Sequence, residues 1–164
     1  MREAIKHSIP PVYDEHSRIL LLGTMPSPKS REQGFFYAHP QNRFWPVLSQ
    51  LFQTEIPNSN AGRTAFLLQH RIALWDVLKS CSIEGASDAS IQDAVPNDLS
   101  LILQHADIRA IFATGTKAAA LYRTYHQPHI DVPFFALPST SAANRGRFPM
   151  EKLLEEYRIL LDYL

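Results

Sequence analysis

The sequence predicts an α/β protein with a four-stranded, mainly parallel central sheet and helices on both faces, that is, a three-layer α/β/α sandwich. Apolar runs of strand length alternate four times with segments of helical periodicity, as in repeated strand–helix units. The runs are mostly apolar throughout, as expected for parallel strands that are buried on both faces. The chain has 164 residues, which is room for one such domain, so residues 1–164 are predicted to form a single unit.

The first half of the chain contains the first predicted strand and the first predicted helix. The strand covers residues 19–22 and follows an irregular lead-in over residues 1–17. The helix runs from about Asn42 to Phe52, because apolar side chains recur there at helical spacing. Pro46 is tolerated only in a first turn, which places the helix start close to Asn42.

The remaining elements continue the alternation of strands and helices. They are a helix over residues 63–70, a strand over 72–78, a polar connection over 79–98, a helix over 99–105, a strand over 108–113, a helix over 117–125, a strand over 132–137 and a last helix over 150–164. The last helix is the clearest, because its apolar side chains form one continuous stripe.

Composition excludes several classes of protein. Apolar residues make up 45% and charged residues 20% of the chain, which is ordinary for a globular protein. No apolar run approaches the roughly 20 residues of a membrane span, so no membrane partner is expected. The single cysteine, Cys81, excludes an internal disulfide and a cysteine-ligated metal site, and it favours a reducing, cytoplasmic setting.

The net charge of zero gives no global basic field for a polyanion, but cations gather locally. Those in two Pro- and Ser-rich loops are Lys29, Arg31, Arg43, Arg145 and Arg147. A locally basic mouth on a neutral body suits a few phosphate contacts rather than tight non-specific binding.

The segment 23–45, GTMPSPKSREQGFFYAHPQNRFW, is the strongest candidate for a functional site. A connection of this length is uncommon in a compact domain unless it is functional or disordered, and its aromatic content speaks against disorder. It leaves the carboxyl end of a strand, and in parallel sheets the loops at those ends share one edge. Asp76, the TGTK loop at 114–117 and the PSTSAANRGR loop at 138–147 are expected at the same edge. Aromatic faces beside Ser hydroxyls and turn amides describe a pocket for a base next to a phosphate track.

The stretch GTMPSPKSREQGFFYAHPQNRFWPVL resembles the first motif of the uracil-DNA glycosylase superfamily. It is most similar to the mismatch-specific uracil-DNA glycosylases and the deoxyinosine (hypoxanthine) DNA glycosylases. The likeness continues, in order and at compatible spacing, through IALWDVL, IFATGTKA, LPSTSAANR and the terminal EKLLEEYRILLDYL. The resemblance therefore covers nearly the whole chain.

The resemblance implies a monofunctional DNA glycosylase of base excision repair that flips a deaminated base out of DNA and hydrolyses its N-glycosidic bond. Hypoxanthine is the implied base, with uracil and xanthine as further candidates, and no metal or other cofactor is implied. DNA containing a deaminated base would be the partner of a monomeric protein. The alternative is a non-catalytic DNA- or nucleotide-binding protein of the same fold.

Two positions depart from the pattern of many members of this superfamily. Met25 stands where many carry an Asp or Asn that positions water, and Leu137 stands where many carry a His or Asn that bonds the base. The deoxyinosine branch also lacks a polar residue at the first position and relies on the Asn of its HPxNRFW element, here Asn42. Both departures favour that branch over a general uracil enzyme.

The candidate site residues fall into three groups. The catalytic candidates are Asn42 and Asp76, the base-binding candidates are Gly23, Thr24, Met25, Pro26, Tyr37 and His39, and the DNA-binding candidates are Ser27, Lys117, Ser139, Ser141, Asn144 and Arg145.

Five of these candidates also have structural interpretations. Asn42 stands where a helix N-cap belongs, and Asp76 could cap the end of its strand. Tyr37 could pack in the core rather than stack on a base, and His39 could fix the loop rather than contact the base. Lys117 could be a helix-terminal cation rather than a phosphate contact.

Overall fold

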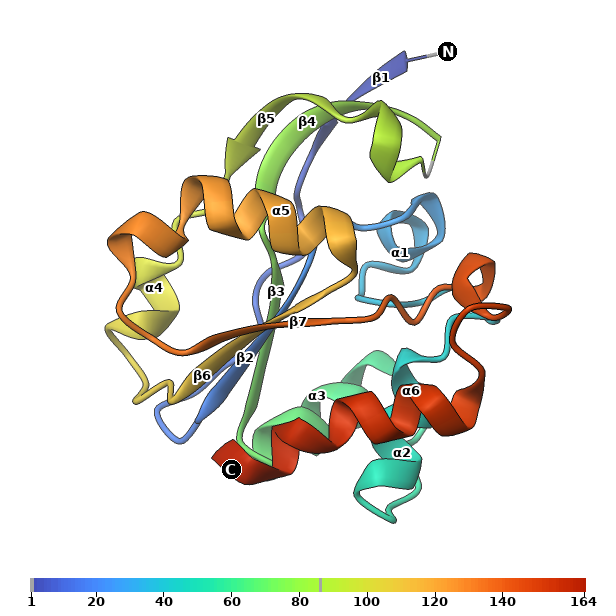
Figure 1. Cartoon of the computed structure of the whole chain (residues 1–164), viewed down its shortest axis with the longest axis vertical. Helices are drawn as coiled ribbons and strands as arrows, with labels where there is room; N and C mark the ends of the chain where they lie inside the picture. Colours follow the sequence, from blue (N-terminus) through green and yellow to red (C-terminus); the bar gives the residue numbers. More distant parts are fainter. Residues whose placement is uncertain (1, 86) are drawn as a thin grey trace.

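A four-stranded parallel sheet forms the centre of the protein, as predicted (Figure 1). The computed structural model describes residues 2–85 and 87–164. The strands are β2 (Ile19–Gly23), β3 (Ile72–Asp76), β6 (Ala110–Thr114) and β7 (Phe134–Leu137), and they lie in the order β3-β2-β6-β7. Each neighbouring pair is parallel.

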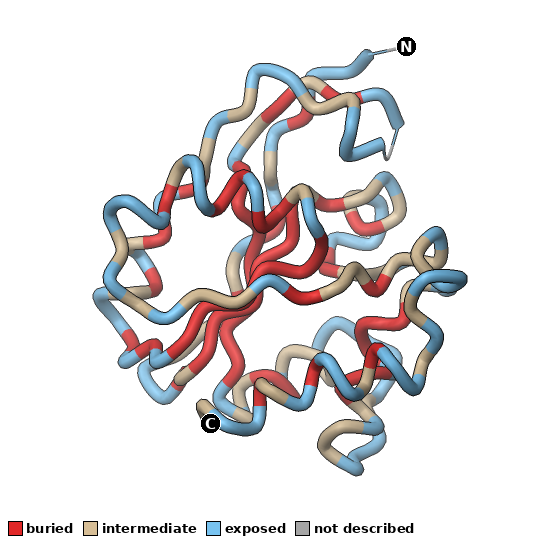
Figure 2. Tube along the Cα trace, viewed as in Figure 1, coloured by how far each residue is buried: buried red, intermediate tan, exposed pale blue. Residues whose placement is uncertain are grey.

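The three strands β2, β3 and β6 are buried along their whole length, which is why their sequences are almost entirely apolar. Figure 2 shows this buried layer running through the middle of the molecule. The register pairs Gly23 with Asp76, and Thr114 with Leu137. These pairings bring the ends of all four strands to one edge.

Helices cover both faces of this sheet (Figure 1). On one face lie α2 (Phe44–Leu51), α3 (Asn60–Gln69) and α6 (Met150–Tyr157), and α2 packs against α6. On the other lie α4 (Ser100–Leu103) and α5 (Thr116–Tyr125). The predicted last helix is shorter than expected, because 3-10 turns over Arg158–Tyr163 replace its second half.

A second sheet was not predicted. It is antiparallel, in the order β1-β4-β5, and consists of β1 (Arg2–Lys6), β4 (Leu78–Glu84) and β5 (Gln92–Pro96). The prediction of an irregular lead-in and of a polar connection over 79–98 was therefore wrong. An antiparallel sheet with one solvated face needs few apolar residues, and in β1 only Ile5 is buried.

Smaller differences also have local causes. The segment 23–45 contains a short helix, α1 (Pro28–Gln33), which the Ser27 side chain caps. Helix α3 begins at Asn60 instead of 63, because the Ser59 side chain caps it by accepting a hydrogen bond from the Gly62 N–H. None of the helices in the described ranges is long and apolar enough to cross a membrane.

Candidate active site

A cavity of about 330 Å³ opens at the carboxyl edge of the parallel sheet. It brings together eleven of the fourteen candidate residues. They are Gly23, Thr24, Met25, Pro26, Ser27, Tyr37, His39, Asn42, Asp76, Ser139 and Ser141. The remaining three, Lys117, Asn144 and Arg145, do not line it.

Asp76 lies at the floor of the cavity, at the end of β3, and only 4% of its surface is exposed. Its Oδ2 lies 2.8 Å from Nε2 of His7, and the two side chains are 5% and 3% exposed. His7 directly follows β1, and its N–H donates to the Lys79 carbonyl oxygen on β4. The second sheet therefore places the buried side chain of His7 against the Asp76 carboxylate.

The floor requires a glycine at position 23. A Cβ there would lie 2.5 Å from Asp76 Oδ1 and 3.0 Å from the Tyr37 hydroxyl oxygen. Both polar groups thus approach the end of β2 more closely than any side chain would allow. The glycine predicted to contact the base also makes room for its neighbours.

The side chain of Asn42 is held through its oxygen. Oδ1 accepts from the Phe44 N–H at 2.9 Å and from the Thr140 hydroxyl at 2.8 Å. Because both partners donate, the atom they contact must be the amide oxygen and not the nitrogen. The Nδ2 amino group is therefore the part of the side chain that is available to the cavity. The N-cap of α2 is Arg43 and not Asn42, so the structural interpretation was wrong in that respect. Asn42 supports the helix start from one residue earlier and still offers two N–H donors to a ligand.

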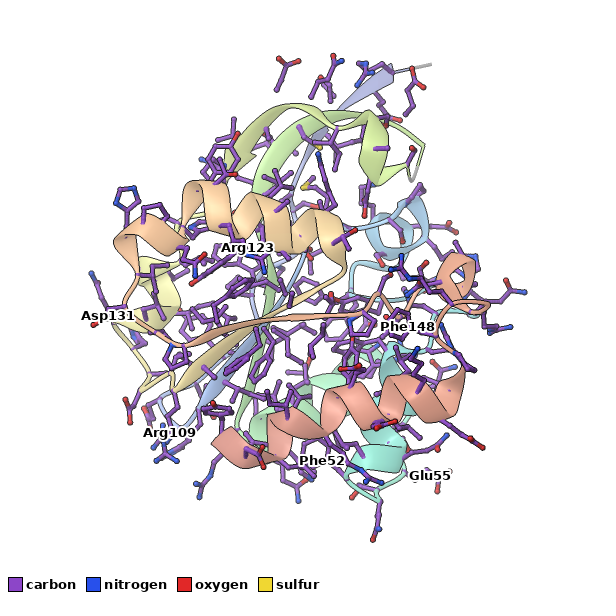
Figure 3. The ribbon with its side chains drawn as sticks, in the orientation of Figure 1. Phe52, Glu55, Arg109, Arg123, Asp131 and Phe148 are labelled. Atoms are coloured by element: carbon purple, nitrogen blue, oxygen red, sulfur yellow. The ribbon has the colours of Figure 1, made fainter. Side chains whose placement is uncertain are left out.

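Arg43 is buried and holds two loops together, so its assignment to a basic mouth was wrong. Its guanidinium donates to the Phe148 carbonyl oxygen at 2.6 Å and to the Ser141 carbonyl oxygen at 3.4 Å. Its backbone N–H donates to the Thr140 carbonyl oxygen. Phe148 lies just before α6 (Figure 3). Arg43 thereby fixes loop 138–148, and with it Thr140, against Asn42.

Tyr37 combines packing with a place in the cavity wall. One face of its ring stacks on Phe44, with centroids 3.9 Å apart and planes at 9°. Its hydroxyl is hydrogen-bonded to Thr114 Oγ1 at 2.6 Å. Burial, and to a smaller extent the Asp76 carboxylate, raise the pKa of this phenol well above its ordinary value, so it stays neutral. The ring is rigidly placed, as a stacking platform requires.

The smaller polar groups at the rim have local hydrogen bonds. Ser27 Oγ accepts from the Ser30 N–H and caps α1. Ser139 Oγ accepts from the Ser141 N–H at 3.1 Å. His39 Nδ1 accepts from the Gln41 N–H at 3.1 Å, which leaves the proton on Nε2. These residues shape the rim. Ser139 and His39 keep a hydroxyl or ring N–H donor there, whereas the Ser27 hydroxyl donates to Ser30 Oγ at 3.2 Å.

The three candidates outside the cavity belong to segments that adjoin residues of its lining. Asn144 Nδ2 donates to the Ser139 carbonyl oxygen, so this side chain braces its own loop. Arg145 is exposed and donates to the Gln41 carbonyl oxygen at 3.3 Å. Lys117 lies in the first turn of α5 and is half-buried.

Several residues of the site were missed by sequence reasoning. Ile83 on β4 forms one wall together with Gly85 and Asp88, which lie in the connection from β4 to β5. Thr140 and His7 hold the two catalytic candidates. For the wall, the available signal was the spacing of the apolar residues Cys81 and Ile83, which lie two positions apart and are both buried in β4. For His7 the sequence offers no signal, because its partner lies 69 residues away.

The arrangement separates an acceptor from donors. The Asp76 carboxylate, at the floor, can accept a hydrogen bond, and Asn42 Nδ2 and His39 Nε2 can donate. Such a site can bind a planar heterocycle that carries both N–H and carbonyl groups. The described lining includes no lysine.

Comparisons with known proteins agree on one family. The family described as the Uracil DNA glycosylase superfamily matches residues 10–162. A hypoxanthine DNA glycosylase of Methanosarcina acetivorans is 34% identical over 143 residues, which cover 86% of this chain and 89% of that protein. One of Methanosarcina barkeri is 33% identical over 115 residues, 69% of this chain and 73% of that protein. A solution NMR structure from Methanosarcina acetivorans, described as a candidate uracil DNA glycosylase, matches with a TM-score of 0.78 and 31% identity, and covers 98% of this chain and 99% of that one.

Proposed function

The chain belongs to the uracil DNA glycosylase superfamily and is a DNA glycosylase, and from this premise we propose that it removes hypoxanthine from DNA. The proposed reaction is monofunctional: the oxygen of water bonds to the sugar C1′ as the C1′–N9 bond breaks and the base leaves as an anion. The water gives up one proton and the departing base takes up one, so the products are the abasic sugar and the neutral base. The absence of a lysine from the described lining supports hydrolysis over a lysine-bound intermediate.

The observation that carries the proposal is the orientation of Asn42. Its oxygen is occupied by Phe44 and Thr140, so the side chain can act only as a donor. A donor stabilises negative charge that develops on the leaving base, whereas deprotonation of water needs a free acceptor. We therefore assign Asn42 to the leaving base rather than to the activation of water.

The other residues have supporting roles in this proposal. The flipped base inserts against the free face of Tyr37, and the rim serines and Arg145 meet the DNA backbone. Extrusion of the base costs a few kcal/mol and is easier for a mispaired base. We place the protein in the cytoplasm, because its one cysteine, Cys81, is a free thiol that has no second cysteine in the chain to pair with. We also propose that it acts as a monomer.

The test uses DNA that contains one hypoxanthine, uracil or xanthine, followed by alkaline cleavage at abasic sites. Asn42→Asp keeps an acceptor for Phe44 and Thr140 but has no donor. We expect it to lower the single-turnover rate on hypoxanthine by about 10²–10³-fold, the usual effect of losing one charge-stabilising donor. Asn58→Asp, on the exposed loop before α3, is the control. Binding without excision on every substrate would refute the proposal and favour a non-catalytic DNA-binding protein.

A further inference from the structure

We propose that His7 is a positioning residue that holds Asp76 as a fixed hydrogen-bond acceptor, and that Asp76 thereby selects bases with an imino N–H on the Watson–Crick edge. This inference rests on the proposed function, because it concerns the base that the cavity receives. The basis is the buried His7–Asp76 pair and the cavity-facing Oδ1.

The hydrogen bonds of His7 fix its protonation. The Ile9 N–H donates to Nδ1 at 3.2 Å, so Nδ1 carries a lone pair and the ring proton is on Nε2. Nε2–H therefore donates to Asp76 Oδ2, which lies 2.8 Å away. In this arrangement His7 is the donor and Asp76 is the acceptor.

The rings around His7 hold it in place. Phe36 and Trp75 lie with their ring centroids 6.1 and 6.2 Å from the imidazole. With one oxygen of Asp76 tied to this rigid donor, the other oxygen has one orientation. That oxygen, Oδ1, lies over Gly23 beside the Tyr37 hydroxyl, and no donor in the described ranges is hydrogen-bonded to it.

The depth of Asp76 determines which part of a base it meets. The glycosidic nitrogen of a flipped nucleotide stays near the mouth, because the sugar remains in the strand. The Watson–Crick edge, on the far side of the base, therefore points to the floor, where Asp76 lies almost fully buried. A carboxylate there pushes electrons toward the base and disfavours an anionic leaving group, so its role is recognition rather than catalysis.

An acceptor at the floor distinguishes deaminated bases from their parents. Hypoxanthine carries N1–H where adenine has a lone pair, and uracil carries N3–H where cytosine has a lone pair. The imino proton pairs with Asp76 Oδ1, whereas a lone pair faces the negative charge with no hydrogen bond. A base that lacks the imino N–H would leave the buried Asp76 carboxylate unpaired, and an unpaired buried polar group gives strong discrimination between closely similar ligands.

The pair also predicts a reversal on substitution. In an Asp76→Asn variant, His7 Nε2–H can only donate, so the amide oxygen must turn toward His7. The amide NH2 then faces the cavity and suits a lone pair instead of an imino N–H. A neutral, nearly isosteric change would thus invert the polarity of the floor, because His7 dictates the orientation.

The experiment measures the preference for hypoxanthine over adenine by binding and by single-turnover excision. Each base is placed opposite a tetrahydrofuran abasic analogue, so that base pairing does not contribute. We expect the wild-type protein to prefer hypoxanthine by at least ~10²-fold. His7→Leu should reduce this preference by about tenfold or more, and Asp76→Asn should reverse it in favour of adenine. His7→Gln, whose Nε2 can replace the imidazole donor, should restore most of it, with exposed His16→Gln as the matched control.

Two outcomes would overturn the inference: an unchanged preference in folded His7→Leu or Asp76→Asn protein, or His7→Gln no better than His7→Leu. Melting temperatures identify a variant that fails to fold, in which case the Asp76→Asn and His7→Gln comparison decides. If the wild type binds hypoxanthine DNA selectively but never excises it, the proposed function fails. The inference is then judged on the binding preferences alone.

Discussion

Replacing Gly23 with alanine tests the close packing at the floor of the cavity. The new Cβ would lie 2.5 Å from Asp76 Oδ1, so β2 and the carboxylate must separate by about 0.5 Å. The carboxylate cannot retreat freely, because His7 holds its other oxygen at 2.8 Å. Overpacking of this kind costs about 1–3 kcal/mol, so we expect the free energy of unfolding to fall by about 2 kcal/mol.

The same displacement should reduce activity, because it moves the group that we place against the base. Misplacement by 1 Å can cost about 10²-fold in rate, so a half-ångström shift should lower single-turnover excision by at least ~10-fold. Urea unfolding and excision of hypoxanthine are the two measurements. Gly146→Ala is the control, since a Cβ there meets nothing within 4 Å. A Gly23→Ala protein with wild-type stability and excision would refute the packing argument.

Three further predictions concern the support of Asn42, the buried phenols and the mouth. Thr140→Val removes the hydroxyl that Asn42 accepts from, and should cost about 1 kcal/mol in urea unfolding as well as slow excision. Burial raises the pKa of Tyr122 to about 12 and raises that of Tyr37, so between about pH 10 and about pH 12 these phenols ionise only in the unfolded chain. Stability is therefore full below pH 10 and should fall above it by about 1.4 kcal/mol per pH unit for each such phenol, as measured by unfolding at graded pH. Arg145→Ala should weaken DNA binding at low salt and reduce the slope of log affinity against log salt by about 1; an unchanged slope would exclude a phosphate contact.

The central sheet could be predicted from the sequence because each of its strands carries its own signal. A parallel strand buried on both faces must be apolar along its length, as 19–22 and 110–113 are. The short antiparallel strands β1 and β4 expose much of their surface and include polar residues, so they resemble loops. Each of these strands forms because it pairs with the other, and the pattern of residues within one strand does not indicate such a partner.

The candidate site divides in the same way. Residues at or just after the ends of strands, such as Asp76 and Ser139, could be placed at one edge because parallel strands end together. The burial of Arg43 could not be predicted, since its partners are carbonyl oxygens about a hundred residues away. The hydrogen bonding of Asn42 Oδ1 could not be predicted either, because one of its donors is the Thr140 hydroxyl, which is distant in the sequence.

The order in which the sheet and the site form during folding follows from the contacts of Arg43, Asn42 and His7. Asn42 and Thr140 are 98 residues apart in the chain, and His7 and Asp76 are 69 apart. Pairing of Ile19 on β2 with Ala110 on β6 closes a loop of similar length. We expect that pairing to form first, because it brings the segments that carry these contacts close together. An intermediate in which β2, β3 and β6 have already paired would thus possess the sheet but neither the donor nor the acceptor of the site. A chain caught at that stage would be compact and inert toward DNA.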